Sequence, residues 1–581
     1  ERVGADDDFF ALGGDSISAM GLGTAARRAG YLLRPRDIFA QRTPARMAQS
    51  MPPLATRTAV SQVKQQGAIA GLPILHWFNE HGGIDQRFAH GVWLQVPSAL
   101  QPAQLEQALT TLSQAHPALA AFTRDGQLVV GETLPAGSPP RVSTLMLNDA
   151  PEACAEDAFD AAVHRLDPAN GVMIQATLLQ HKGQTFGLVL VIHHLVVDGV
   201  SWRVLLEDLR EAAEAVINGT PVTLPAEETS LHDWSAALLR DTAHRVSELP
   251  FWQSMLQDAV PPLGQRAVHG QDTHGEMKEK RTLLNGSQTQ ALLSTLPQQF
   301  RASVEETLLC TLSLALADRF KVCQLRYTLE SHGRAELEGD RDLARTVGWL
   351  TAEYPLLITL GNSDNGTLRD AIRAVKHVLR AVPDRGIGYG QLRYLDAVRG
   401  PELKTLAQQH APEVLFNYLG RFSAGDALWT PQRTRRQFRD AFAVYQSPAM
   451  PQLHGLEVNI FVDENGAMPQ LAINWGWLSG VFSEEDIDAL HQAMADACEA
   501  LAGFARRHPQ QACDTLVAAE VAMDDVSQQD LVALGDRHGP LAAVLPLLPL
   551  QKGLLFHAAT ADNSGSYNSL TRLTFSGALE E

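Results

Sequence analysis

A short apolar run that ends in two histidines is the feature that most constrains how this chain folds. Residues 185–192 (Thr-Phe-Gly-Leu-Val-Leu-Val-Ile) are continuous and rich in branched side chains, which predicts a strand buried on both faces. His193 and His194 follow the run directly. Because a buried imidazole without a partner is costly, we expect both rings to face a cleft or to have fixed hydrogen-bond partners.

The residues after the histidines predict an amphipathic helix. Apolar side chains recur at helical spacing from Trp202 to Val216, with Ser201 placed to cap the helix and Gly219 just beyond its end. The two histidines therefore lie in a connection between a strand and a helix. The same spacing favours a core position for Trp202 over a position against a substrate.

The order His-His-x-x-x-Asp-Gly at 193–199, followed by Val-Ser-Trp-Arg at 200–203, fixes several residue types at set offsets. It resembles the signature of condensation-superfamily domains of nonribosomal peptide synthetases, and the Val-Ser-Trp-Arg continuation resembles their epimerization branch. The resemblance implies that His194 is catalytic. It also implies that His193 turns away into a hydrogen bond and that Asp198 pairs with an arginine. The motif residues expected to be structural are His193, Asp198, Gly199 and Arg203.

A second motif lies near the N-terminus. Residues 8–20 (Asp-Phe-Phe-Ala-Leu-Gly-Gly-Asp-Ser-Ile-Ser-Ala-Met) place Ser16 at the start of a helical pattern, where a phosphate would be stabilised. The segment resembles a peptidyl carrier domain, which implies that Ser16 receives a 4′-phosphopantetheine arm from a phosphopantetheinyl transferase; a simple helix cap is the alternative. In this family, an aspartate before the serine, here Asp15, is typical of carriers that feed epimerization domains.

An internal repeat indicates the domain organisation. Residues 72–78 (Leu-Pro-Ile-Leu-His-Trp-Phe) are echoed at 548–556, and the two prolines lie 476 residues apart, one whole domain of this superfamily. The expected divisions are a carrier lacking its first helix at 1–50, a linker at 51–68, an epimerization domain at 69–513 with lobes at about 69–235 and 250–513, a linker at 514–544, and the truncated start of a condensation domain at 545–581.

The fold class that follows is α/β (α+β). The resemblance implies a small helical bundle for the carrier and two chloramphenicol acetyltransferase-like lobes arranged in a V around a central tunnel.

The C-terminal lobe carries the second catalytic candidate. Residues 329–334 (Leu-Glu-Ser-His-Gly-Arg) follow a strand-like segment and resemble the Glu-Gly-His-Gly-Arg-Glu motif of epimerization domains, which implies that Glu330 is catalytic. Two residues depart from that motif, since Ser331 replaces glycine and Ala335 stands where the family has glutamate. Glu336 is therefore the alternative acid.

Three more segments resemble epimerization motifs: 346–351 (Thr-Val-Gly-Trp-Leu-Thr), 383–390 (Pro-Asp-Arg-Gly-Ile-Gly-Tyr-Gly) and 416–420 (Phe-Asn-Tyr-Leu-Gly). The second lacks the Gly-x-Gly-x-x-Gly spacing of a nucleotide site, so we predict a loop at the tunnel mouth. Packing roles are equally open for the last segment. The candidate tunnel residues are Trp202, His332, Arg334, Tyr389, Asn417 and Tyr418.

The implied reaction is inversion at the α-carbon of an aminoacyl or peptidyl thioester. A base removes the Cα proton and an acid delivers another to the opposite face, which is general acid–base catalysis. His194 needs little tuning for this task, whereas Glu330 needs a pKa raised by burial. The alternatives are a peptide-bond-forming condensation domain and a catalytically silent docking module; Asp15 and the two motifs around His194 and Glu330 favour epimerization.

Composition limits the partners. A net charge of −19 without a basic cluster argues against nucleic acid, and the apolar stretches at 186–197 and 541–550 are interrupted and too short to span a bilayer. Five cysteines without Cys-x-x-Cys spacing indicate neither a metal site nor a disulfide framework, so a reducing cytoplasm is expected. The expected partners are the chain's own carrier, an upstream adenylation domain and a downstream condensation domain.

Overall fold

The computed structural model describes residues 3–560 with short gaps. The gaps are 10–11, 13, 15, 52–66, 84–86, 132–141, 147–150, 336, 338–341, 362–367, 423–426, 435, 437, 439–441, 465–467, 522 and 524. Asp15 and the alternative acid Glu336 thus lie outside the described residues, as do most of the predicted linker at 51–68 and the last part of the segment at 545–581.

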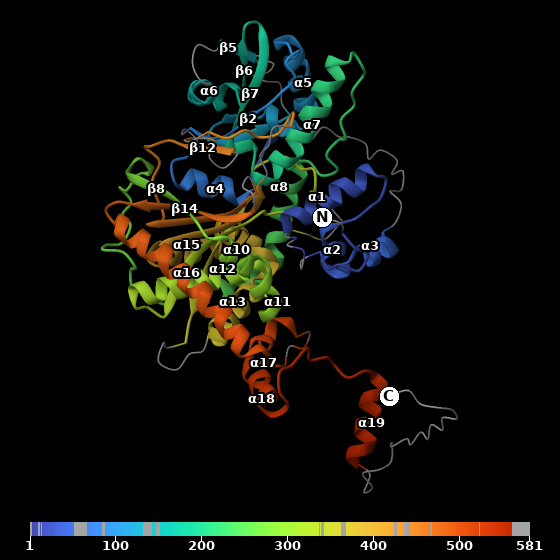
Figure 1. Ribbon diagram of the computed structural model, residues 1–581, viewed down its shortest axis with the longest axis vertical. Helices are drawn as coiled ribbons and strands as arrows, with labels where there is room; N and C mark the ends of the chain where they lie inside the picture. The colour runs from blue at the N-terminus through green and yellow to red at the C-terminus, as the bar shows by residue number, and fades with distance from the viewer. Residues whose placement is uncertain are drawn as a thin grey trace.

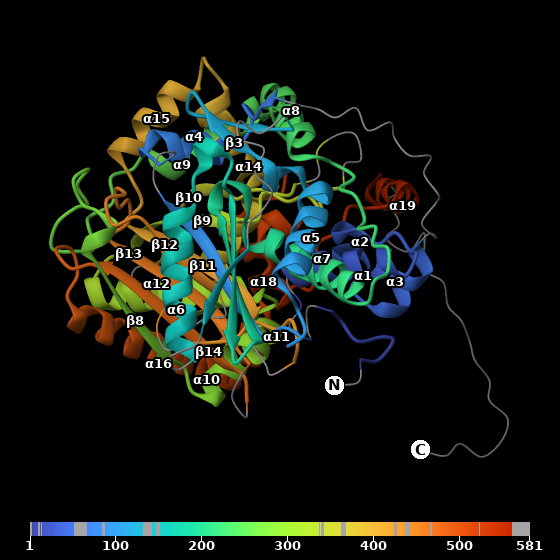
Figure 2. The ribbon, with the colours of Figure 1, turned by 90° about the horizontal axis from the view of Figure 1, so that it is seen from above.

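Three short helices form the N-terminal unit, shown in blue in Figure 1: α1 (Ser16–Arg28), α2 (Pro35–Gln41) and α3 (Pro44–Ser50). The two prolines occupy first-turn positions, where a missing N–H costs nothing. This unit lies beside the larger two-lobed body (Figure 2). Its small core consists of Ala19, Leu33, Ile38 and Met47.

The first lobe is built on a five-stranded sheet. Strand β7 (Gln184–His193) confirms the predicted strand, and its side chains alternate between two cores. One core packs under α5 (Pro102–Ala115) and α7 (Gly199–Ile217), and the other under α6 (Pro151–Arg165). The strand order is β12 (Phe442–Gln446), β2 (Phe88–Leu94), β7, β6 (Ile174–His181) and β5 (Val142–Met146).

A smaller sheet and several helices complete this lobe. The strands are β1 (Gly67–Ala68), β4 (Gln127–Val130) and β3 (Phe122–Arg124). Because β1 pairs with β4, residues 67–68 belong to the lobe and not to the predicted linker. The remaining helices around the junction of the lobes are α4 (Pro73–Glu80), α8 (Leu231–Asp241) and α9 (Leu249–Leu256).

The second lobe is built on a six-stranded sheet. In order, its strands are β10 (Ala352–Thr359), β9 (Gln324–Ser331), β11 (Val414–Phe422), β13 (Leu456–Asp463), β14 (Gln470–Leu478) and β8 (Met277–Leu283). The helices associated with this lobe and its C-terminal extension are α10 (Gly286–Gln290), α11 (Leu296–Phe300), α12 (Val304–Phe320), α13 (Leu368–Ala381), α14 (Ile387–Gly390), α15 (Gly400–Gln409), α16 (Glu484–Arg507), α17 (Pro509–Cys513), α18 (Gln528–His538) and α19 (Pro549–Thr560).

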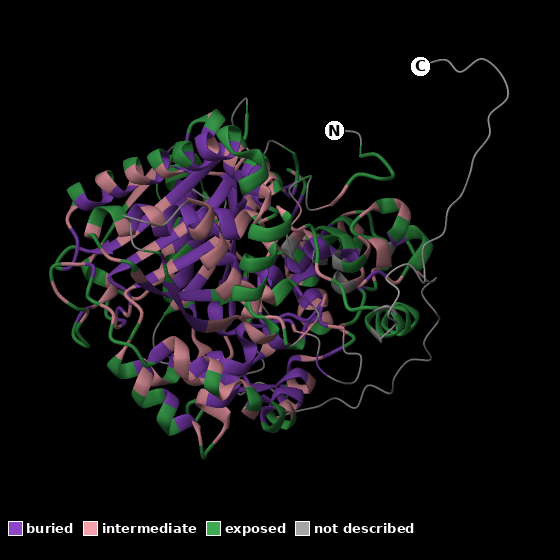
Figure 3. Cartoon of the chain, turned by 90° about the horizontal axis from the view of Figure 1, so that it is seen from below, coloured by how far each residue is buried: buried purple, intermediate pink, exposed green. Residues whose placement is uncertain are grey.

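The two faces of this sheet differ in polarity. Side chains alternate along a strand, so Tyr327 and Leu329 of β9 enter the core under α12, α13 and α16 while Glu330 points to the opposite face. Figure 3 shows the buried strands inside and exposed helix surfaces outside. The face that carries Glu330 also carries polar residues of the neighbouring strands, and it provides one wall of the candidate site.

The two lobes exchange segments. The predicted boundary between residues 235 and 250 therefore does not fully separate them. Strand β12 lies far into the second half of the sequence but pairs with β2 in the sheet of the first lobe. Residues 342–350 also cross to the first lobe, where Thr346 Oγ1 donates to the carbonyl of Thr229 at 2.7 Å. Such long-range pairing leaves no local signal in the sequence.

Residues 387–390 form helix α14 instead of the predicted loop. The glycines there serve close packing: a Cβ at Gly388 would lie 2.0 Å from Glu248, and one at Gly390 would lie 2.7 Å from Pro73. The glycine repeat therefore brings this short helix against two other elements, a role that the spacing alone did not distinguish from a flexible loop.

The predicted linker after residue 513 begins as a packed segment. Thr515 is fully buried, and Lys376 of α13 donates to its carbonyl at 2.7 Å. Arg373, one turn earlier on α13, forms an ion pair with Asp514 at 3.2 Å. The start of this segment is therefore held on the second lobe.

A tight turn at Gly333 generates the first prediction. Gly333 has φ +63°, and a Cβ there would lie 1.5 Å from the carbonyl oxygen of Leu350. Gly126 has a similar φ of +73° with no atom within 4 Å of its Cβ position. We expect Gly126→Ala to cost about 1–2 kcal/mol from the left-handed backbone alone. Gly333→Ala should cost roughly 1–3 kcal/mol more, because the Leu350 backbone must move.

Urea unfolding followed by tryptophan fluorescence measures both variants. Equal losses in Gly126→Ala and Gly333→Ala would contradict the close approach of the two backbone segments.

Candidate active site

His194 is held in one orientation at the end of β7. Its Nδ1 lies 2.6 Å from the carbonyl oxygen of Val197. A carbonyl only accepts hydrogen bonds, so Nδ1 carries the proton of the neutral ring and Nε2 keeps a free lone pair. The local turn therefore leaves Nε2 as the unprotonated nitrogen of the ring.

Aromatic side chains surround the His194 ring. Trp349 stacks on it at 4.3 Å between centroids, and Phe88 and His90 lie at 4.4 and 3.9 Å. Burial lowers the pKa of His194 to about 4, and the Val197 carbonyl and the Asp198 charge offset only part of that effect. The ring is consequently neutral near pH 7.

His193 lies on the other side of the strand end and is fully buried. Its Nδ1 accepts a hydrogen bond from the backbone N–H of Leu195 at 3.2 Å. This is the placement expected of a residue that supports the turn.

Asp198 joins the two lobes. It accepts from the backbone N–H of Ser201 at 2.8 Å, so Asp198, and not Ser201, is the cap of α7. Arg334 of the second lobe contacts both of its carboxylate oxygens, at 2.8 and 3.0 Å. Burial alone would raise the pKa of Asp198, but Arg334 and Ser201 more than offset it and the pKa is lowered.

This ion pair corrects the tunnel role predicted for Arg334. The guanidinium is buried and also donates to the carbonyl of Thr346 at 3.0 Å, while the backbone N–H of Leu350 donates to Asp198 at 3.2 Å. Arg334 therefore holds the segment that ends in Trp349 and Leu350.

Glu330 stands on the polar face of the second sheet. Its side chain is exposed to solvent by surface area, although many protein atoms lie around the carboxyl group. Asn417 of β11 donates to its Oε2 at 3.2 Å and shares the same amide with Asn459 at 3.2 Å. Burial and the nearby Glu457 raise the pKa of Glu330 to about 7. The carboxyl group therefore exchanges a proton near neutrality.

The other candidate residues are placed as follows. Trp202 is 1% exposed and packs against Phe442 at 5.6 Å, so it is a core residue and does not face a tunnel. His332 accepts from the backbone N–H of Arg334 at 3.0 Å, and burial lowers its pKa to about 3. Tyr418, next to Asn417 on β11, packs against the core under the sheet.

Two motif residues of α7 face outward. Gly199 begins the helix and has no atom within 4 Å of a Cβ position, so its backbone is open. Arg203 is exposed and lines an apolar pocket together with residues of the N-terminal unit, including helices α1 and α3.

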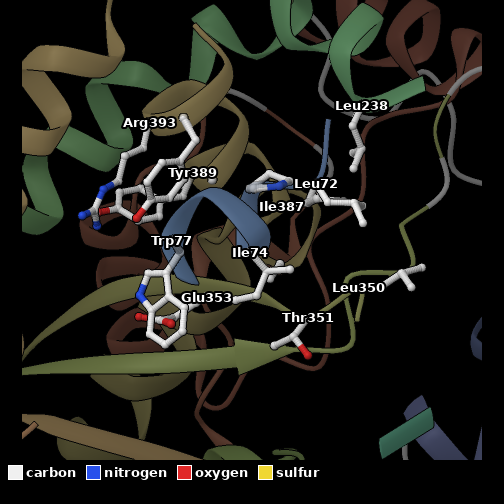
Figure 4. Close-up of a pocket in the computed structure, with 14 residues that line it drawn as sticks. Leu72, Ile74, Trp77, Leu238, Leu350, Thr351, Glu353, Ile387, Tyr389 and Arg393 are labelled. Carbon is white, nitrogen blue, oxygen red and sulfur yellow. The ribbon is translucent and has the colours of Figure 1, made fainter. Parts of the chain in front are cut away.

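A small cavity lies beside the site, between the two lobes (Figure 4). Its volume is about 30 Å³, enough for a water molecule. Tyr389, a predicted tunnel residue, contributes to its lining. The full lining is Leu72, Pro73, Ile74, Trp77, Leu238, Leu350, Thr351, Ala352, Glu353, Ile387, Tyr389, Gly390, Arg393 and Tyr394.

Sequence reasoning missed three parts of the site. Trp349 lies inside the motif at 346–351, but the motif predicts no role for it. Phe88 and His90 belong to a strand without a motif. Glu353 is the one charged residue of strand β10, and its position in that strand is the only feature of the sequence that could have indicated it.

The N-terminal helices contact the body through α1. Arg27 forms an ion pair with Glu228 at 3.0 Å and also contacts Asp342. Ser16 is the first residue of this 13-residue helix, whose N-terminus suits a phosphate group.

The described part of the chain contains neither a metal-binding cluster nor a membrane-spanning helix. Across the described ranges, no group of three or more His, Cys, Asp or Glu side chains is arranged to hold a metal ion. Among the same residues, no helix is long and apolar enough to cross a membrane.

Comparisons with known proteins agree with this arrangement. The sequence model of the condensation domain matches residues 77–532, and that of the phosphopantetheine attachment site matches residues 1–51. The epimerization domain from the third module of tyrocidine synthetase B has a TM-score of 0.64 at 24% identity, covering 75% of this chain and 97% of that one. This similarity establishes the fold.

Curated relatives are synthetases. Vanchrobactin synthetase VabF of Vibrio anguillarum is 36% identical over 590 residues, covering 100% of this chain and 20% of that protein. Chondramide synthase cmdD of Chondromyces crocatus is 30% identical over 579 residues, covering 97% of this chain and 14% of that protein. The chain thus spans a fifth or less of these relatives.

The two interlocked lobes and the His-His-x-x-x-Asp-Gly site define a domain of the condensation superfamily, which confirms the predicted fold class. The chain belongs to the condensation-domain family of nonribosomal peptide synthetases and carries a phosphopantetheine attachment domain before it.

The Asp198–Arg334 pair generates the second prediction. Asp198→Ala leaves a buried guanidinium without its carboxylate, and we expect a loss of about 3–5 kcal/mol in the stability of the two-lobed body. Replacing both residues, Asp198→Asn with Arg334→Met, should cost less than Asp198→Ala alone.

Asp318→Ala is the matched control, since Asp318 pairs with Lys321 at 2.8 Å on the surface. It should leave the thermal unfolding midpoint unchanged. A small effect of Asp198→Ala in the same thermal scan would show that the pair does not join the lobes.

Proposed function

We propose that this chain epimerizes the α-carbon of an aminoacyl or peptidyl group held as a thioester on a carrier. The observation that carries the proposal is that one lobe contributes His194, whose Nδ1 is held by the Val197 carbonyl so that Nε2 keeps its lone pair, while the other contributes Glu330, whose pKa is raised to about 7. Inversion needs one group to remove a proton and another to supply one from the opposite face. The fold supplies two such groups.

The thioester would be carried by 4′-phosphopantetheine on Ser16. The bound arm presents the acyl group as a thioester, whose carbonyl acidifies the Cα–H. Ser16 fits the attachment because it opens helix α1, whose N-terminus favours the phosphodiester. A phosphopantetheinyl transferase, an upstream adenylation domain and a downstream condensation domain are the partners that this function requires.

The proton inventory of the site follows from the two pKa values. Between about pH 4 and about pH 7 the pair holds one proton, which resides on Glu330. His194 Nε2 then accepts the Cα proton, and Glu330 donates its own to the other face. The reverse reaction starts from protonated His194 and ionised Glu330, which is the same total charge, so both directions share one pH dependence.

Condensation is the second candidate because the family match is to the condensation domain. Peptide-bond formation needs a base near an attacking amine but no proton donor on the opposite face. Glu330, with its raised pKa and its amide partner Asn417, has no part in that reaction, which favours epimerization.

The third prediction tests the reaction itself. An L-aminoacyl phosphopantetheine is loaded on Ser16 in D₂O, and mass spectrometry follows Cα deuterium while chiral analysis follows the D/L ratio. We expect deuterium uptake with a mixed D/L product. His194→Ala and Glu330→Gln should each lower the rate about 10²-fold or more, since each removes a proton-transfer group.

His538→Ala and Glu485→Gln, at exposed positions on α18 and α16, are the matched controls and should react like the wild type. Absence of exchange, together with consumption of the thioester when an acceptor aminoacyl carrier is added, would establish condensation instead.

The fourth prediction concerns pH. Burial raises the pKa of Glu330 to about 7, so the group is protonated below this value and ionised above it. We therefore expect the exchange rate to fall as the pH rises through about 7, in both directions of the reaction. Initial rates of deuterium uptake across this range, corrected with His194→Ala for uncatalysed exchange, test the sign. A rate that rises through about pH 7 to a plateau would contradict donation by Glu330.

A further inference from the structure

A second carboxyl group lies directly beside Glu330. Strands β9 and β10 are antiparallel, and their register sets Glu353 opposite Glu330. Directly opposed residues project from the same face of a sheet with Cβ atoms about 4.5–5.5 Å apart. The two carboxyl groups are therefore neighbours on the polar face.

Among the described residues, no cationic side chain is bound to this pair, although the charge of Arg393 partly lowers the pKa of Glu353. Within the described residues, no lysine or arginine forms an ion pair with Glu330 or Glu353; the nearby Arg393 is paired with Glu80 at 3.2 Å. Like charges directly opposed on a sheet are destabilising. Burial and the charge of Glu330 raise the pKa of Glu353 to about 8, so the two groups retain a proton near neutrality.

Glu353 also faces the cavity shown in Figure 4, whereas Glu330 is not part of its lining. Trp77 lines the same cavity, and its indole lowers the pKa of Glu353 in part. The hydroxyl of Tyr394, which also lines the cavity, is buried without a partner among the described residues, and a water molecule in the cavity would satisfy it.

The groups that face Glu353 come from four elements. Glu330 faces it from β9, Trp77 from α4 and Tyr389 from α14, while Arg393 and Tyr394 lie in the helical turn after α14. Glu80 on α4 lies behind Arg393 and holds that guanidinium. Glu353 is thus the carboxyl group that connects the cavity to Glu330.

Each inversion leaves the site in the wrong protonation state for the next. Glu330 has given up its proton, and His194, which is enclosed by Trp349, Phe88 and His90, has gained one. The next substrate of the same configuration must wait until a proton returns to Glu330 and one leaves His194.

We propose that Glu353 is a positioning residue that restores the proton of Glu330 after each inversion. This inference rests on the proposed function. Protonated Glu353 passes its proton to ionised Glu330. Glu353 then takes a proton from solvent, relayed by a water molecule in the cavity, and the proton that His194 releases to solvent balances the cycle. Glu353 never touches the substrate, so its removal affects the return step and not the inversion.

The test compares the first turnover with later ones. The full chain is mixed in D₂O with excess free L-aminoacyl-pantetheine thioester, using the proteinogenic amino acid that the wild type exchanges fastest, and samples are quenched rapidly. In Glu353→Gln, which preserves the size of the side chain, we expect the first inversion within about twofold of wild type and later inversions about tenfold slower. The wild type should show no such burst, and Glu353→Asp should restore much of the later rate.

Two outcomes would overturn the proposal. Equal first and later rates in Glu353→Gln would show that the proton returns without Glu353. A first inversion slowed as much as the later ones would show a structural role for Glu353 in placing Glu330. No exchange by the wild type with any aminoacyl group would instead refute epimerization, so the two failures are distinguishable.

Discussion

The buried ion pair between Asp198 and Arg334 is the interaction on which the rest of the site depends. A buried ion pair offsets the cost of desolvation only when its remaining hydrogen-bonding capacity is used. Here most of that capacity is used: the carboxylate caps α7 and receives the N–H of Leu350, and the guanidinium donates to Thr346, while Arg334 Nε has no partner among the described residues. One contact therefore fixes the turn that carries His194 and the segment that carries Trp349, although these are far apart in the sequence.

Loss of hydration accounts for the protonation states of both His194 and Glu330. The charged form is disfavoured in each group, which lowers the pKa of His194 and raises that of Glu330. For a base this means a neutral ring, and for an acid it means a retained proton. The two surroundings differ: aromatic rings enclose His194, whereas the carboxyl group of Glu457 adds to the loss of hydration at Glu330.

The parts of the fold that sequence reasoning predicts are local, and the parts that it misses are not. The strand before His193 and the helix after it follow from apolar spacing, which alternates or recurs within a few residues. The sequence pattern favours Ser201 as the cap, but Ser201 and Asp198 are both good cap residues and only the backbone decides between them. The helix at 387–390 is missed because glycines there serve close packing, which depends on distant neighbours.

In the candidate site, too, the local features can be predicted from the sequence and the long-range ones cannot. Both proposed proton-transfer residues come from motifs, but the pairing of Glu330 with Glu353 is a matter of register between two strands that are 20 residues apart in sequence. Register depends on tertiary contacts and leaves no pattern in either strand alone. The strand β12, which extends the sheet that carries His194, is a longer-range case.

The proposed inversion would make particular use of the two lobes. Groups that act on opposite faces of one carbon cannot both project from a single sheet face, because neighbouring side chains there point the same way. His194 comes from a strand end in one sheet, and Glu330 comes from the face of another. Long strands hold both groups, and the ion pair and crossing segments hold the lobes together. Positioning by rigid elements of this kind is what proton transfer demands, since its rate falls steeply when donor and acceptor are misplaced.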